Sequence, residues 1–153
     1  MSGVRPGVRL AVDVGRARVG LAASDPAGSL AFPVETLPRS GDIVGRITAE
    51  AAERDALEIV VGLPMSLSGG DTPSTADARD VAAALAAASP VPVRLVDERL
   101  STVSAQSALH SAGRTTRSSR SVVDQVAAVI ILQHALDSER SGGRPPGAIV
   151  EPT

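Results

Sequence analysis

The sequence predicts a single α/β domain in which helices flank one mixed β-sheet. Three short apolar segments separated by turn-rich breaks come first, and apolar segments of helical and extended periodicity then alternate. The length of 153 residues suits one domain, and 43% hydrophobic with 21% charged residues is typical of a folded chain. Uninterrupted apolar runs, such as residues 126–132, are much shorter than the roughly 20 residues of a membrane span. We therefore expect no membrane segment.

The first three apolar segments, residues 9–15, 19–25 and 30–37, should form an antiparallel meander. The breaks between them contain Gly15 and the turn sequence of residues 25–28, Asp-Pro-Ala-Gly. Short extended segments bounded by Gly, Pro and Asp are typical of hairpins.

An amphipathic helix follows the meander, because Ile43, Ile47 and Ala51 recur every four residues. Asp42 is a plausible N-cap for this helix. The remaining expected elements are strands at 58–63 and 91–98, a Ser- and Gly-rich loop at 65–75, and helices marked by residues 78–85, 103–112 and 122–136.

This order of elements gives a mixed sheet of a three-strand antiparallel meander plus two further strands, joined by right-handed crossovers and flanked by helices. It matches an RNase H-like sheet. Residues 1–140 are expected to form this domain, and the Gly- and Pro-rich tail at 141–153 is expected to be flexible. The chain contains no cysteine and no visible secretory leader, which predicts a cytoplasmic protein without disulfides or thiolate metal sites.

Carboxylates stand in apolar surroundings at three places, where an unpaired charge is costly. Asp13 lies inside an apolar strand, Asp97 and Glu98 end another strand, and Asp124 opens the most apolar helix. Functional groups of open sheets gather at strand ends, so these carboxylates could converge. Oxygen ligands without histidine or cysteine favour Mg²⁺ or Mn²⁺, and such ions promote phosphodiester displacement.

Each carboxylate also has a structural explanation that the residues alone leave open. Asp13 begins a D-x-G pattern that is common in turns. Asp97 and Glu98 could each pair with a neighbouring arginine. Asp124 has the spacing of a capping box with Ser121.

Arginines are the candidate contacts to substrate phosphates. All fifteen basic residues are arginine, and the net charge of −2 means that any basic surface is local. The single aromatic residue, Phe32, makes base stacking nearly unavailable. Solvated surface charge is the alternative explanation for the arginines of the turn and of the loop, whereas Arg99 could instead orient a carboxylate. The candidates are Arg16 and Arg18 beside the turn after Asp13, Arg99 next to Glu98, and Arg114, Arg117 and Arg120 in a polar loop without acidic neighbours.

Four blocks of this sequence resemble the YqgF/RuvX family of RNase H-fold nucleases in order and spacing. The blocks are LAVDVGRARVGLAASD at 10–25, IVVGLPMSLSGG at 59–70, VDERLSTVSAQ at 96–106 and VVDQVAAVIILQHAL at 122–136. The resemblance implies an RNase H-like fold and a catalytic, metal-binding triad of Asp13, Glu98 and Asp124. It also selects Glu98 over Asp97. The family's usual lysine-rich loop is represented here by arginines alone.

The resemblance further implies a metal-dependent hydrolase that cleaves phosphodiester bonds in structured nucleic acid, in maturation of the 5′ end of pre-16S rRNA. A Holliday junction is the alternative substrate, and a nuclease that cuts such a junction symmetrically would need to be a two-fold dimer. A non-catalytic RNA- or ribosome-binding factor would keep the fold and the arginines but would not need Asp13. A phosphotransferase related to actin and the sugar kinases shares D-x-G, but it would need a second domain of this kind.

Overall fold

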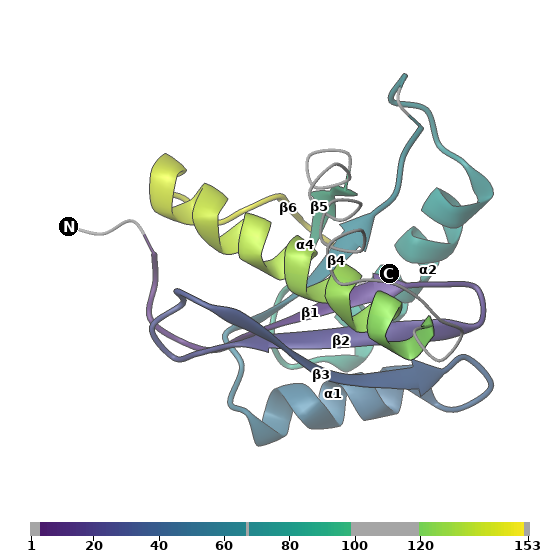
Figure 1. Cartoon of the computed structure of the whole chain (residues 1–153), viewed down its shortest axis with the longest axis horizontal. Coiled ribbons are helices and arrows are strands. Elements are labelled where there is room, and N and C mark those ends of the chain that lie inside the picture. The colour runs from purple at the N-terminus through teal and green to yellow at the C-terminus, as the bar shows by residue number, and fades with distance from the viewer. Residues whose placement is uncertain (1–3, 67, 99–119, 152–153) are drawn as a thin grey trace.

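The computed structural model describes residues 4–66, 68–98 and 120–151, with only the backbone described at 120–124. The strands form one sheet in the order β3-β2-β1-β4-β5-β6 (Figure 1). The elements are β1 (Arg9–Val14), β2 (Arg18–Ser24), β3 (Ala31–Pro38), α1 (Ile43–Glu53), β4 (Glu58–Leu63), α2 (Pro73–Ala88), β5 (Val93–Asp97), α4 (Arg120–Gly142) and β6 (Ala148–Ile149). None of the described helices is long and apolar enough to cross a bilayer.

The direction of the strands brings the carboxyl ends of β1, β4 and β5 to the same end of the sheet. The strands β1, β2 and β3 are antiparallel, as expected for the meander. The strands β1 and β4 are parallel, with Val12 beside Val61, and β4 and β5 are parallel, with Leu63 beside Asp97. Residues that end these three parallel strands are therefore neighbours across the sheet.

Each strand divides its side chains between two cores. Leu10 and Val12 of β1 belong to the core beneath α1 and α2, whereas Ala11 belongs to the core beneath α4. Val60 of β4 and Val96 of β5 also belong to the core beneath α4. Because side chains alternate along a strand, the odd positions of β1 and the even positions of β4 and β5 face α4.

Both cores consist of small and branched aliphatic side chains. All buried hydrophobic residues in the described part of the chain are Ala, Val, Leu or Ile, and Phe32 is 38% exposed. A chain with a single aromatic residue has to build its core from such side chains. The helix α4 contributes a stripe of residues with helical spacing, namely Ala128, Ile131, Leu132, Ala135 and Leu136.

The predicted elements match the structure within a few residues, with three differences. The helix α2 begins at Pro73, inside the expected loop, because Thr72 and Thr75 form a capping box and proline suits the first helical turn. The helix α4 extends to Gly142, beyond the expected end. The unpredicted strand β6, within the tail expected to be flexible, pairs antiparallel with β5. The mobility of the rest of that tail stays a prediction, and the expected helix at 103–112 lies outside the described residues.

Candidate functional site

Asp13 and Glu98 occupy adjoining strand ends on the face that α4 covers. Asp13 is the fifth residue of β1, at an odd position like Ala11, and is half-buried. Glu98 directly follows β5 and is also half-buried. Burial of the Glu98 carboxyl, followed by the nearby negative charges of Asp13 and Asp97, raises its pKa to about 7. The two carboxylates are therefore close enough to repel each other.

The alternation of β5 separates Glu98 from its neighbour Asp97. Asp97 lies beside Leu63 in the register with β4, and it follows Val96, which belongs to the core under α4. Position 97 therefore belongs to the opposite face from Val96, whereas position 98 returns to the α4 side. The side chain of Glu98 accordingly lies over Gly62, which Ile131 of α4 also approaches. This placement favours Glu98 over Asp97 as the partner of Asp13.

The third predicted ligand, Asp124, lies in the first turns of α4. It is four residues, about one helical turn, before Ala128, which is buried against the sheet. The side chain of Asp124 is outside the described part of the structure. Within the described part, no three His, Asp or Glu side chains form a group that could hold a metal ion. The convergence of the complete triad stays a prediction.

The turn between β1 and β2 presents two of the predicted substrate-binding arginines. Arg16 is exposed, and Arg18 is half-buried at the start of β2. The amide of Gly15 donates a hydrogen bond of 2.9 Å to the carbonyl oxygen of Arg18. A Cβ at position 15 would lie 2.6 Å from that oxygen, so this turn requires glycine. Arg16 also lines an open depression of about 410 Å³ together with Pro73 and Ser74 of α2.

Arg39 fixes this turn to α2, an interaction that the sequence analysis missed. Its guanidinium donates hydrogen bonds of 2.8 and 3.0 Å to the carboxylate of Asp77, and one of 2.8 Å to the carbonyl oxygen of Gly15. The hydrogen bonds from Arg39 lower the pKa of Asp77. No local pattern predicts this pair, because the two residues are 38 positions apart.

The other predicted arginines cannot be placed in the described structure. Arg99, Arg114 and Arg117 lie outside the described residues, and Arg120 is the first residue of α4, described only by its backbone. Their contacts with substrate stay predictions.

Two glutamines attach α4 to strand β3 and its preceding turn. Gln125 donates a hydrogen bond of 3.1 Å to the hydroxyl of Thr36. The side-chain oxygen of Gln133 accepts a hydrogen bond of 2.9 Å from the amide of Ala31. Gln125 directly follows Asp124, so its bond to β3 lies at the end of α4 that carries the third predicted ligand.

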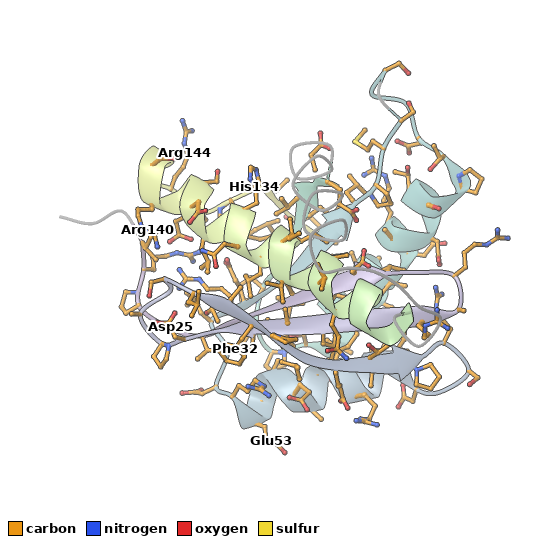
Figure 2. All side chains as sticks on the ribbon, in the orientation of Figure 1. Asp25, Phe32, Glu53, His134, Arg140 and Arg144 are labelled. Atoms are coloured by element: carbon orange, nitrogen blue, oxygen red, sulfur yellow. The ribbon has the colours of Figure 1, made fainter. Side chains whose placement is uncertain are left out.

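A buried ion cluster lies at the far end of α4, where Figure 2 shows Arg140 and Arg144. Its members are Arg5, Arg9, Glu58, Arg94 and Glu139. Glu139 accepts hydrogen bonds of 2.9 Å from Arg5 and 3.1 Å from Arg9. The cluster joins the N-terminal segment, three strands and α4, and none of its members belongs to the predicted site.

Comparisons with known proteins agree on the family and the fold. The model of the RuvX family, described as Holliday junction resolvase, matches residues 7–138. A protein of Clavibacter michiganensis subsp. michiganensis (strain NCPPB 382) named "Putative pre-16S rRNA nuclease" is 62% identical over 151 residues, covering 96% of this chain and 93% of that protein. A protein of the same name from Nocardioides sp. (strain ATCC BAA-499 / JS614) is 56% identical over 156 residues, covering 98% of this chain and all of the relative.

Among solved structures, RuvC of T. thermophilus in complex with a Holliday junction substrate is similar, with a TM-score of 0.54 and 18% identity. The similarity covers 91% of this chain and 99% of RuvC. It confirms the RNase H-like fold that the order of elements predicts. Since the family model spans most of the chain and these relatives align over nearly their whole length, this chain belongs to the RuvX family of nucleases, enzymes that hydrolyse phosphodiester bonds.

Proposed function

We propose that this nuclease depends on a divalent metal ion and matures the 5′ end of pre-16S rRNA, using the site at the carboxyl ends of β1 and β5. The observation that carries the site is the pair of half-buried carboxylates Asp13 and Glu98: burial raises the pKa of Glu98, and the nearby charge of Asp13 raises it further. The substrate is inferred from the name shared by relatives that are 56 and 62% identical.

The carboxylate pair fits a hard divalent cation. Two neighbouring carboxylates repel each other unless a proton or a cation compensates their charge. Their donor atoms are oxygens, which suit Mg²⁺ and Mn²⁺. Asp13 and Glu98 would hold the metal, with Asp124 supplied by α4. When bound, such ions stabilise the charges on the attacking and leaving oxygens of a phosphodiester.

The arginines would bind and orient the substrate strand. Arg16 is exposed on the turn that follows Asp13 in the chain, so a phosphate bound there would be held near the carboxylates. Arg18 extends this basic turn into β2. We propose the same role for the four arginines whose side chains are not described, Arg99, Arg114, Arg117 and Arg120. Because phosphate contacts position a nucleic acid without reading its bases, recognition should depend mainly on substrate shape.

A cleavage assay tests the carboxylates against a matched neighbour. We expect Asp13→Asn and Glu98→Gln to abolish cleavage of a pre-16S rRNA fragment in Mg²⁺, because each removes a charged ligand. Asp97→Asn should retain activity, because position 97 lies on the opposite face of β5. If Asp97→Asn abolishes cleavage and Glu98→Gln does not, the choice of partner is wrong. If purified wild type cleaves fully in EDTA, the metal-dependent mechanism is wrong.

The same preparations distinguish the two substrates. The description of the family and the RuvC structure favour a four-way DNA junction as the second candidate. We expect the RNA precursor to be cut at its mature 5′ end and the junction to stay intact. In cells whose only copy carries Asp13→Asn, the uncut precursor should accumulate. If the protein cleaves only the junction, its function is Holliday junction resolution, and we would then expect a two-fold dimer.

A further inference from the structure

We propose that Gly62 is a positioning residue for the nuclease site. The absence of a side chain at position 62 would provide the space in which the Glu98 carboxyl lies beside Asp13. This inference rests on the proposed function for the role of Glu98, but the contact itself is independent of that role. Gly62 is the fifth residue of β4, the central strand of the three that end at the site.

The space above Gly62 is filled by two side chains from other elements. A Cβ at position 62 would lie 2.7 Å from Oε2 of Glu98 and 3.0 Å from its Cγ. It would also lie 2.5 Å from Cδ1 of Ile131 in α4. Carbon atoms in contact are ordinarily 3.5–4.0 Å apart, so at least one of these groups would have to move.

Backbone conformation does not explain the glycine. The φ angle of Gly62 is not positive, so a residue with a side chain could adopt the same backbone conformation. Glycine weakens a strand interior and often marks a place where another group approaches closely. Every residue of β4 is buried, so a larger side chain at position 62 would add apolar contacts if there were room for it. The approach of Glu98 and Ile131 is the remaining physical reason.

The atoms that approach Gly62 belong to side chains, which makes the inference testable without destroying the fold. A methyl group at position 62 meets no backbone atom among its three nearest neighbours. Gly62→Ala should therefore displace the Glu98 carboxyl or the tip of Ile131 and leave β4 paired with β1 and β5. Displacement of the carboxyl would change its position relative to Asp13, and with it the geometry of the proposed metal site.

We would measure Mn²⁺ affinity by calorimetry, the melting temperature, and RNA cleavage for Gly62→Ala. The expected result is a loss of Mn²⁺ affinity of about 10- to 100-fold, as for other residues that orient metal ligands, with a melting temperature lowered by only a few degrees. Gly41→Ala is the matched control, because its nearest neighbour is an oxygen of Pro38 at 3.7 Å, an ordinary contact. This control should keep the affinity of the wild type.

The double variant Gly62→Ala with Ile131→Val separates the two contacts, because valine lacks Cδ1. If the glycine positions Glu98, the double variant should recover melting temperature but not Mn²⁺ affinity. If the glycine serves only the packing of α4, the double variant should recover both, and the inference is wrong.

Two ligand variants distinguish failure of this inference from failure of the proposed function. If Asp13→Asn and Glu98→Gln weaken Mn²⁺ binding while Gly62→Ala does not, Gly62 has no positioning role and the site stands. If neither ligand variant changes Mn²⁺ binding, the proposed metal site is itself wrong, whatever the result for Gly62.

Discussion

At the scale of single residues, the site depends on the environment of two carboxylates. Asp13 and Glu98 are both half-buried and face α4, so water screens their charges less than it would at the surface. The raised pKa of Glu98 means that ionising it costs more free energy in the folded protein than in the unfolded chain. Folding therefore becomes less favourable as the pH rises from the ordinary pKa of glutamate towards about 7.

We predict that Asp13→Asn melts at or above the temperature of metal-free wild type at pH 8, because it removes part of the repulsion on Glu98. The difference should shrink at pH 5, where Glu98 carries a proton in the fold. Mg²⁺ should raise the melting temperature of the wild type but change that of the variant little.

Scanning calorimetry in EDTA and in Mg²⁺ at both pH values measures this effect. The control is Asp80→Asn, at an exposed position in α2, and Mg²⁺ should change its melting temperature as it does that of the wild type. An Asp13→Asn variant that melts well below metal-free wild type would show that Asp13 is a structural carboxylate.

At the scale of elements, the β1–β2 turn is held in place by α2. Arg39 joins the carbonyl oxygen of Gly15 to the carboxylate of Asp77, and each charged partner of this pair is about 30% exposed. Partly exposed ion pairs contribute little to stability, so the pair serves mainly to orient the turn. That turn carries Arg16, which we propose holds a substrate phosphate near Asp13.

We predict that Arg39→Met lowers the free energy of unfolding by about 1 kcal/mol and weakens RNA binding more than this small loss suggests. The loss of three hydrogen bonds should free the turn and spread Arg16 over many positions. Binding titrations and hydrogen exchange at the turn measure the two effects. Arg46→Met, which removes a comparable pair with Glu35 on the surface, is the control and should leave the exchange of the turn unchanged. If hydrogen exchange at the turn is also unchanged in Arg39→Met, Arg39 does not position the turn.

At the scale of the whole molecule, the two ends of the sheet have different tasks. The predicted nuclease site occupies the carboxyl ends of β1 and β5, and the buried ion cluster occupies the opposite end. Burial alone would raise the pKa of Glu139, but hydrogen bonds from Arg5 and the charge of Arg9 lower it to about 2. Since the side chains of Glu139 and Arg9 are each only 1% exposed, these interactions are poorly screened by water.

We predict that Glu139→Gln lowers the free energy of unfolding by about 3 kcal/mol at pH 7, because it removes the charged partner of the buried Arg9, whereas Arg5 keeps its ion pair with Glu58. A lowered pKa stabilises the fold above the ordinary pKa of glutamate, and this stabilisation is lost as the pH falls towards 2. The difference between wild type and variant should therefore be full at pH 7 and clearly smaller at pH 3. Urea unfolding at the two pH values measures it.

Glu53→Gln is the control for this experiment, since Glu53 is exposed at the end of α1 (Figure 2). It should change the free energy of unfolding by less than about 0.5 kcal/mol at either pH. Equal losses for Glu139→Gln at pH 7 and pH 3 would show that the cluster acts through packing and not through charge.

The sequence by itself determined the local elements and the first candidates for the site. Hydrophobic periodicity acts over a few residues, so the meander, α1, β4 and the helix α4 could be predicted from neighbouring positions alone. Asp13 and Glu98 were also recognisable, because a carboxylate within an apolar strand is a local anomaly. Family resemblance added the choice of Glu98 over Asp97, and strand alternation in the structure favours the same choice.

Only the tertiary structure decided which distant residues support these elements. The pairing of β6 with β5, the bonds of Arg39 to Asp77, and the ion pair of Arg5 with Glu139 join positions far apart in the chain. The crowded space above Gly62 exists because β4, β5 and α4 meet there. No local pattern encodes such contacts, because they depend on how the sheet brings its strands and helices together.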